Sequence, residues 1–394
     1  MTYNAAIKKL RLERIGMAPF VWLGKLAAIL FPLKTQHGIF LFFPNADIGG
    51  SVKVNADLTQ LLKNKNPLII FSKKAHNNQY QERFEMEGVK IIDIHKWVDN
   101  KAFHFVNFFF RGLLAGWINK QPGTTAFGGE SIFFYKVIPH IKKDIRCIEL
   151  SHVNKWLPYS IGFIDRINAR IFSTRAILKD VEVQYTENNL PEQYFKKLHF
   201  IDNAIDIPDS TPVNNELVQV YYIGRGAPQK RVPLIAAIAQ QLHAKNLPVE
   251  FNFVGDVDKV IKPGDYPYCK FYGIINDENI MHSLYQKADM LILTSAFEGL
   301  PVVIMQMMAY GKVVISTAVS GIPDYIFHER NGMLIFPTEE KMIIAEGVKI
   351  VEQLLREPNL RHQLGQQAKK DAIATFGRQA FEESYLTILG FKRS

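Results

Sequence analysis

The sequence predicts an α/β protein of two domains, each built on a doubly wound parallel sheet. At 394 residues the chain is too long for one ordinary core and suits two domains of about 150 to 200 residues each. Its apolar content of 47%, including 28 phenylalanines, is enough for two cores. Short apolar runs alternate with longer helix-compatible segments, which is typical of parallel strands that are buried on both faces.

Seven apolar runs in the first half of the chain are the expected strands of the first domain. They occupy residues 38–43, 67–71, 90–94, 124–127, 145–150, 181–185 and 199–201. The stretch 207–216 is rich in Pro, Ser and Asn, as in a linker between domains. We therefore expect the first domain at 37–208 and the second, which opens with an apolar strand, at 217–376.

Residues 1–36 combine six basic residues and one acidic residue with a mostly apolar run from Ile15 to Leu33. Lys25 and Pro32 interrupt this run, and a charge in mid-span is costly, so a membrane-spanning helix is disfavoured. The central lysine and the lack of a small-residue cleavage site also argue against a signal peptide. Two alternatives stay open. We favour a helix that contacts an anionic membrane; the other is a helix that packs on the first domain.

Charge and cysteine usage narrow the function classes. The net charge is +9, but the sequence has no zinc-finger spacing, no aromatic RNA-binding strand and no basic repeat, so no nucleic-acid partner is expected. Cys147 and Cys269 are too few and too far apart for a disulfide framework. A reducing, cytoplasmic compartment is the simpler interpretation.

The stretch 291–324 contains the strongest functional pattern. An apolar strand at 290–294 is followed by a polar turn with Glu298, and a helix is entered through Pro301. Proline is tolerated there because the first N–H groups of a helix have no partner within it. Those N–H groups and the helix dipole favour an anion, and the turn lies at the carboxyl end of a strand, where open α/β sheets bind ligands.

This stretch resembles the donor-site signature of the GT-B glycosyltransferases of family 4, which are retaining enzymes that use sugar nucleotides. The matching residues are Ser295, Glu298, Gly299, Leu300, Pro301, Met308, Ala309 and Gly311. The second glutamate of the family pattern is replaced by Gln306. The resemblance runs from about residue 37 to the end of the chain. It implies the GT-B fold, two doubly wound Rossmann-like domains that face a central cleft, with a C-terminal helix at about 377–394 returning to the first domain.

Two further elements of the first domain resemble the family. Gly49 and Gly50 follow the first strand, where paired glycines allow close approach of a ligand, and Ser51 is a candidate cap for a helix from about Val52. His152 follows the strand at 145–150, where the family carries a histidine that touches the donor sugar.

The loop after strand 218–223 resembles the family element that binds the donor diphosphate. It contains Gly224, Arg225 and Lys230, and Arg231 is a possible additional contact. Breaking a sugar–diphosphate bond leaves negative charge on phosphate, which Arg engages through two donors and Lys as a compact charge. The turn at Gly273–Ile275, with Ile274, is expected to frame the nucleotide base. Asp256-Val257-Asp258 matches a strand-end loop of the family, so we expect no catalytic metal.

By resemblance, the catalytic residues are Glu298 on the sugar hydroxyls, Arg225 and Lys230 on the diphosphate, and His152. The implied activity is a retaining transfer from a UDP- or GDP-sugar to a lipid-linked or growing cell-envelope glycan such as lipopolysaccharide. It takes place on the inner face of the cytoplasmic membrane without a cofactor.

Two alternatives stay open. A nucleotide-sugar epimerase of the same architecture would need acid and base groups, for which the sequence offers His152, Glu130 and Glu149. A catalytically silent donor-binding partner is suggested by Gln306, because an amide accepts fewer hydrogen bonds than the carboxylate it replaces.

Overall fold

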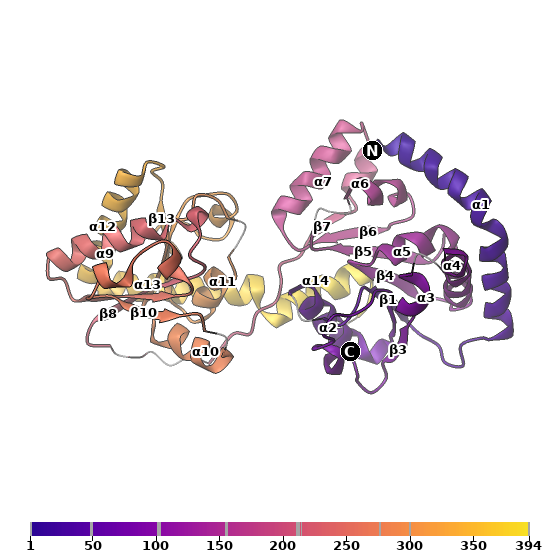
Figure 1. Ribbon diagram of the computed structural model, residues 1–394, viewed down its shortest axis with the longest axis horizontal. Coiled ribbons are helices and arrows are strands. Elements are labelled where there is room, and N and C mark those ends of the chain that lie inside the picture. The colour runs from indigo at the N-terminus through magenta and orange to yellow at the C-terminus, as the bar shows by residue number, and fades with distance from the viewer. Residues whose placement is uncertain are drawn as a thin grey trace. The chain divides into compact units, whose positions relative to one another are not determined.

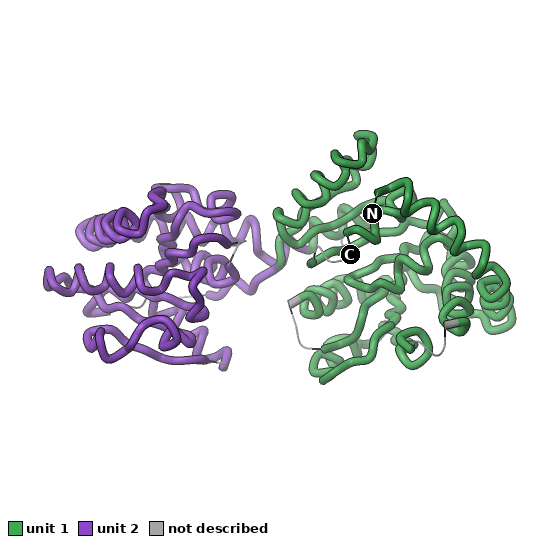
Figure 2. Tube along the Cα trace, turned by 45° about the horizontal axis from the view of Figure 1, so that its top comes forward, with its two compact units in different colours: residues 1–203, 382–394 green, residues 204–381 purple. Residues whose placement is uncertain are grey.

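The computed structural model describes residues 2–47, 50–100, 104–153, 157–209, 213, 215–275, 277–298 and 301–392. The chain divides into two compact units (Figure 2). Unit 1 comprises residues 1–203 and 382–394, and unit 2 comprises residues 204–381. Each unit contains one parallel sheet, so the predicted fold class, two doubly wound α/β domains, is confirmed.

Unit 1 contains a seven-stranded parallel sheet in the order β3-β2-β1-β4-β5-β6-β7 (Figure 1). The central strands are buried along their whole length because helices cover both faces. The strands are β1 (Ile39–Phe43), β2 (Leu68–Phe71), β3 (Lys90–Asp93), β4 (Thr125–Gly129), β5 (Arg146–Ser151), β6 (Ala169–Phe172) and β7 (Leu198–Phe200).

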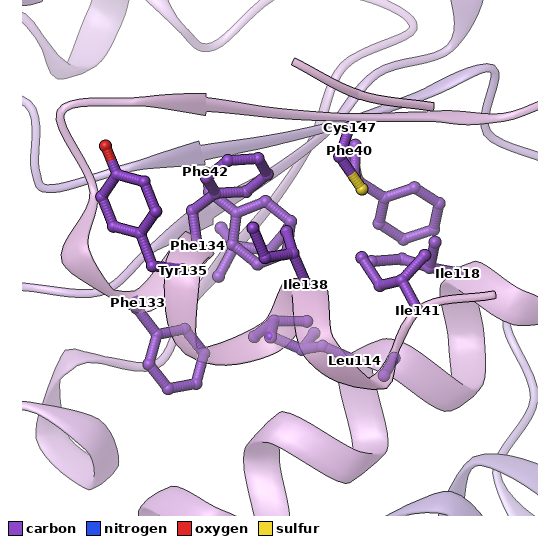
Figure 3. Close-up of a cluster of buried hydrophobic side chains, with 14 of the residues drawn as sticks. Phe40, Phe42, Leu114, Ile118, Phe133, Phe134, Tyr135, Ile138, Ile141 and Cys147 are labelled. Atoms are coloured by element: carbon purple, nitrogen blue, oxygen red, sulfur yellow. The ribbon is translucent and has the colours of Figure 1, made fainter. Parts of the chain in front are cut away.

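The helices of unit 1 connect these strands. On one face, Phe40 and Phe42 of β1 pack with Leu114 and Ile118 and with Phe134 in a continuous apolar core (Figure 3). The helices are α1 (Tyr3–Leu30), α2 (Gly50–Leu62), α3 (His95–Val98), α4 (His104–Asn119), α5 (Ile132–Val137), α6 (Leu157–Ser160), α7 (Arg175–Glu187) and α8 (Glu192–Phe195).

One strand of the first domain was predicted in the wrong place. Residues 181–185 belong to helix α7, whose Thr174 side chain caps the first turn by accepting a hydrogen bond from Ile177 N–H (3.3 Å). Ile177, Val181 and Tyr185 are four residues apart and all buried, which is the spacing of one helix face. The strand at this position of the sheet is β6, which the sequence conceals because Arg170 interrupts its apolar run.

Two helix boundaries also differ from the expectation. Helix α2 begins at Gly50, so Ser51 lies inside its first turn and is not the cap. The C-terminal segment forms two helices, α13 (Pro358–Phe376) and α14 (Arg378–Leu389), which are separated at Gly377. Gly377 pairs with Ile205 in an isolated bridge, which brings together the two places where the chain passes between units.

Helix α1 packs along α4 through small residues. A Cβ atom on Gly24 would lie 2.0 Å from the Phe109 carbonyl oxygen, and one on Gly112 would lie 2.0 Å from that of Val21. The backbones of the two helices are therefore in contact, as the second alternative, a helix that packs on the first domain, requires. Within the described ranges, no helix is long and apolar enough to cross a membrane.

The opposite side of α1 is apolar and exposed. Its large side chains are more than one third exposed, in contrast to the buried seam of Met17, Val21 and Ala28. These exposed residues, which we call the outer stripe, are Leu12, Ile15, Trp22, Leu23, Leu26, Ile29 and Leu30.

Unit 2 contains a six-stranded parallel sheet in the order β10-β9-β8-β11-β12-β13. Its strands are β8 (Val218–Ile223), β9 (Val249–Val254), β10 (Lys270–Gly273), β11 (Met290–Leu293), β12 (Val313–Thr317) and β13 (Met333–Ile335). Its helices, besides α13, are α9 (Val232–Ala244), α10 (Glu278–Lys287), α11 (Val302–Ala309) and α12 (Glu340–Arg356).

The glycine seam gives a stability prediction with a matched control. Gly112→Ala should destabilise unit 1 by about 2 kcal/mol or more, because the new methyl group overlaps backbone atoms of α1. Gly16→Ala, in the same helix pair but with nothing within 4 Å of its Cβ position, should stabilise by roughly 0.5 kcal/mol through higher helix propensity. Urea unfolding followed by circular dichroism measures both changes. Similar shifts for the two variants would contradict the close approach of the helices.

Candidate active site

The candidate site of unit 2 lies where the strand order of its sheet reverses. Strands β8 and β11 are neighbours, paired through Val220↔Met290 and Tyr221↔Leu291, although β9 and β10 separate them in the sequence. Helices that follow two such strands leave on opposite sides of the sheet, and ligands of open α/β sheets bind between the loops. The loops after β8 and β11 carry the predicted charged residues.

The loop after β8, residues 224–231, holds two of the predicted cations. Arg225 is exposed, and its carbonyl oxygen accepts a hydrogen bond from the Tyr222 hydroxyl (2.8 Å). Gly226 lies against the next loop, where a Cβ atom would come within 2.1 Å of the Asp256 carbonyl oxygen. Lys230 ends a short 3-10 turn and is 16% exposed. The loop backbone is thus fixed at the strand ends while the Arg225 side chain stays accessible.

Lys230 pairs with Glu298, which lies in the loop after β11. The Lys230 ammonium contacts the Glu298 carboxylate, and the Glu298 side chain is only 10% exposed. The Ser295 hydroxyl donates a further hydrogen bond to Glu298 Oε1 (2.7 Å). Solvent screens a partly buried pair less than a surface pair, so each charge restrains the other. The structure brings together two of the four residues predicted to be catalytic.

Helix α11 starts shortly after Glu298 in the sequence. Pro301 is its N-cap residue, with φ −62° and ψ 132°. The first helical residue is therefore Val302, and the proline lies just before the helix. Gln306 lies on α11 and is half-buried. The dipole of α11 favours an anion at the start of this helix.

The remaining predicted binding residues are placed as follows. Ile274 follows Gly273, which has a positive φ of 66°, and is 68% exposed. Gly224 leaves no room for a side chain, because a Cβ atom would lie 2.8 Å from the Tyr222 hydroxyl. Gly50 is the first residue of α2. Gly49, Gly299 and Leu300 lie outside the described residues.

Arg231, the possible additional phosphate contact, lies against the loop after β11. Its guanidinium donates hydrogen bonds to the carbonyl oxygens of Thr294 (2.7 Å) and Ser295 (2.8 Å), so these donors are used within the protein and not held out for phosphate. The sequence analysis also missed Thr294 and Gln229, which join the same two loops. One indication of these contacts was present in the sequence, which is an arginine at position 231, where the family often has glycine.

His152 of unit 1 is held by a carboxylate. Glu130 Oε1, in the loop after β4, accepts hydrogen bonds from the backbone N–H groups of His152 and Val153 (3.1 Å for Val153). The Glu130 carboxylate therefore fixes the loop and is not a free group for an acceptor. His152 Nε2 is buried and has no hydrogen-bond partner within the described part of the chain. Burial lowers the pKa of His152 to about 4, so the imidazole is neutral at pH 7.

Glu149, the other candidate of this region, belongs to a buried network. Its carboxylate pairs with Arg170 (Nε to Oε2, 2.5 Å), and both side chains are 1% exposed. Tyr135 also donates to it, and Arg170 donates to the hydroxyls of Tyr185 and Ser160 (2.7 Å each). A carboxylate paired in this way is structural, so the epimerase alternative loses two of its three candidate groups.

The Asp256-Val257-Asp258 triplet is part of a loop. Asp256 accepts from Gly226 N–H (2.8 Å) and pairs with Lys259 (2.6 Å). In the parts of the chain that the structure describes, no cluster of three His, Cys, Asp or Glu side chains could hold a metal ion.

Part of the chain matches a known protein family. Residues 204–371 match the family model described as glycosyl transferases group 1. The match covers less than half of the chain but nearly all of unit 2. The matched residues include both loops of the candidate site, and the predicted family resemblance is confirmed for this part of the chain.

Curated relatives and solved structures are similar to larger parts of the chain. An uncharacterized glycosyltransferase of Methanocaldococcus jannaschii is 27% identical over 44% of this chain and 45% of its own length. The poly(ribitol-phosphate) alpha-N-acetylglucosaminyltransferase of Staphylococcus aureus is 23% identical over 58% of this chain and 45% of its own length. The chain thus spans about half the length of these relatives.

One solved structure is similar over nearly the whole chain. Anabaena HepE in complex with UDP and glucose has a TM-score of 0.61 and 15% identity, covering 90% of this chain and 100% of that chain. At this identity the likeness concerns the fold alone, and it agrees with the GT-B prediction.

The burial of His152 predicts its titration. Its folded pKa of about 4 lies below the ordinary value of 6.5, so the unfolded chain binds this proton more readily. The stability that neutral His152 contributes is present above about pH 6.5 and is lost as the pH falls towards 4. Imidazole nitrogen NMR should show neutral His152 at pH 5.5, and His152→Gln should make stability less dependent on pH in this window. Protonation near pH 6.5 would contradict the burial of Nε2.

Proposed function

We propose that the chain is a retaining glycosyltransferase that moves a sugar from a nucleotide-sugar donor to a glycan acceptor. The observation that carries this proposal is the Lys230–Glu298 pair, which joins a cation and a carboxylate at the reversal point of a parallel sheet. Unit 2 is the donor side in this proposal, and unit 1 is the acceptor side.

The proposed leaving group is the donor diphosphate. Arg225 is exposed, and Lys230 lies five residues further along the same loop. The loop therefore carries a guanidinium, which can bind phosphate through two donors, and a compact ammonium group. Negative charge grows on the phosphate as the bond to the sugar breaks. Fixed cations and the start of α11 stabilise that charge more than they stabilise the bound donor, which is how electrostatic preorganisation raises kcat.

Glu298 is proposed to accept hydrogen bonds from hydroxyl groups of the donor sugar. It is already desolvated and ion-paired, so a sugar hydroxyl meets an oriented carboxylate. Gln306 is proposed to bind the ribose and Ile274 to frame the base, with Gly224 and the 299–301 segment beside the phosphates. An amide still bonds a ribose diol, because hydroxyls both donate and accept.

The proposed chemistry needs no protein nucleophile. The acceptor hydroxyl attacks the face from which the nucleotide leaves, the C–O bond to phosphate breaks, and the departing phosphate takes the acceptor proton. The protein then contributes positioning and electrostatic stabilisation. A neutral His152, whose Nε2 is buried and unpartnered among the described residues, can offer a hydrogen bond without adding charge.

Relatives favour one donor and one acceptor class. The solved structure of HepE holds UDP and glucose, and the Staphylococcus aureus relative acts on poly(ribitol phosphate), a polymer. We therefore propose a UDP-sugar donor ahead of a GDP-sugar, and a lipid-linked or growing envelope glycan as acceptor.

We further propose that residues 1–36 contact an anionic membrane from the cytoplasmic side. The outer stripe of α1 is apolar and exposed, and Lys8 and Arg11 lie on the same helix before it. Basic residues beside an exposed apolar helix face suit a surface with negative lipids. Such contact would keep the enzyme near a lipid-linked acceptor.

The donor class is tested by thermal stability with UDP-, GDP-, ADP- and dTDP-sugars. A ligand at about a hundred times its Kd stabilises the folded state by about 2.7 kcal/mol. UDP-sugars should raise the Tm selectively. Arg225→Ala should weaken this binding about tenfold or more, since a hydrogen bond to a charged group contributes roughly 1.5–3 kcal/mol.

Two further variants complete this test. Arg356→Ala, an exposed arginine at the end of α12 in the same unit, should leave nucleotide affinity unchanged. Gln306→Glu should strengthen UDP binding severalfold, because the ribose bond becomes charge-assisted; unchanged affinity would contradict the ribose assignment. If no nucleotide sugar raises the Tm at millimolar concentration, the silent-partner alternative replaces the transferase.

The membrane contact is tested by sedimentation with vesicles. The protein should bind vesicles containing phosphatidylglycerol, bind pure phosphatidylcholine weakly, and dissociate at high salt. The double variant Trp22→Ser and Ile29→Ser should reduce binding about tenfold or more, because less apolar surface is buried. Val183→Ser, an exposed apolar site on α7, is the control. Equal sedimentation of all three proteins would count against the proposal.

A further inference from the structure

Arg231 and Thr294 join the two loops of the candidate site through reciprocal contacts. Arg231 Nε and Nη2 donate to the carbonyl oxygens of Thr294 and Ser295, which are fully buried residues. The Thr294 hydroxyl donates back to the carbonyl oxygens of Arg231 (2.9 Å) and Lys230 (3.2 Å). The residue that follows Lys230 and the segment that leads to Glu298 are thus each fixed by the opposite loop.

The backbone at Arg231 is strained. Its φ of +47° and ψ of +42° are in the left-handed region, which costs free energy for a residue with a Cβ atom. Such a conformation persists only where the surroundings determine it, and it is common at functional sites. Here the two hydrogen bonds of the guanidinium offset the strain and hold the turn that presents Lys230.

The same two loops are joined by neutral contacts as well. The N–H of Ala296 donates to the carbonyl oxygen of Gln229 (2.8 Å), and the Gln229 side chain donates to the carbonyl oxygen of Phe297 (2.7 Å). Arg231 is the charged member of this set. Its loss would remove the side-chain donor from the buried Thr294 carbonyl, whereas the Ser295 carbonyl would keep the Thr317 hydroxyl (2.7 Å).

We propose that Arg231 is a positioning residue that sets the place of Lys230 relative to Glu298. This inference rests on the proposed function: the leaving diphosphate must meet Lys230 while Glu298 holds the sugar. A displacement of about 1 Å between such groups can cost about a hundredfold in rate. In this proposal Arg231 acts through Lys230, because its Nε and Nη2 atoms donate to carbonyl oxygens of the opposite loop.

The kinetic test compares three variants. Arg231→Gly removes the guanidinium and relieves the backbone strain, so it should fold with a Tm close to that of the wild type. Its kcat with a UDP-sugar should fall about a hundredfold while KM changes less than about threefold, because Lys230 contributes mainly in the transition state. Arg231→Lys keeps the charge but cannot donate in the same fork, so it should not restore kcat. Asn246→Gly, another left-handed position in unit 2, should be neutral.

Hydrogen exchange gives a readout that does not depend on activity. In Arg231→Gly, amides of 226–231 and 294–298, with Ala296 as the central probe, should exchange faster than in the wild type. They should be unchanged in Asn246→Gly. Unchanged exchange, or a wild-type kcat in Arg231→Gly, would overturn the inference. Recovery of both kcat and UDP affinity in Arg231→Lys would replace it with a direct phosphate contact. An inactive wild type would overturn the proposed function, and exchange would still decide the role of Arg231.

Discussion

The candidate site depends on the pairing of two parallel strands that are distant in the sequence. Because β8 and β11 are neighbours, the loops that follow them begin side by side, and the rigid ladder fixes their starting points. Unit 1 repeats the arrangement with β1 and β4, and Glu130 follows β4 there. The position of the functional residues is therefore a consequence of strand order, and loop composition decides only which groups are presented.

Charge in the unit 2 site is balanced before any ligand binds. Lys230 and Glu298 are largely removed from solvent, and neither would be stable there alone. A donor with a diphosphate and hydroxyl groups provides each of them with a replacement partner. Binding of such a donor can thus exchange the contact between Lys230 and Glu298 for contacts with the donor, without leaving a buried charge unpaired. The contacts between backbone and neutral side chains of the two loops remain in place.

The sequence was sufficient for most of the fold because strands buried on both faces are continuous apolar runs. It failed at β6 and α7, where the pattern was ambiguous. Arg170 made a buried strand look polar, and its partner Glu149 is 21 residues away, so no local pattern signals that the charge is neutralised. Val181 and Tyr185 fit a short strand as well as a helix face until the Thr174 cap is taken into account.

The candidate site was predictable where it matched a motif and unpredictable where it depends on contacts between loops. Glu298, Lys230 and Arg225 were proposed from residue type and spacing, and the structure brings the first two into contact. The roles of Arg231 and Glu130 were not, because each is defined by carbonyl or N–H groups of a distant segment. Both residues also have positive φ values, 47° for Arg231 and 58° for Glu130. Glycine is the only residue type whose presence in a sequence clearly indicates a positive φ.

The buried Arg170–Glu149 pair also limits how this protein can diverge. Removing either partner alone leaves an isolated charge in the core, at a cost of about 3–5 kcal/mol, whereas replacing both by apolar residues of similar volume is often neutral. The same pair is hydrogen-bonded to the hydroxyl groups of Tyr135, Tyr185 and Ser160. These buried hydroxyl groups lose those partners when the pair is lost. In related sequences these five positions should therefore be retained or exchanged together, as one inherited unit.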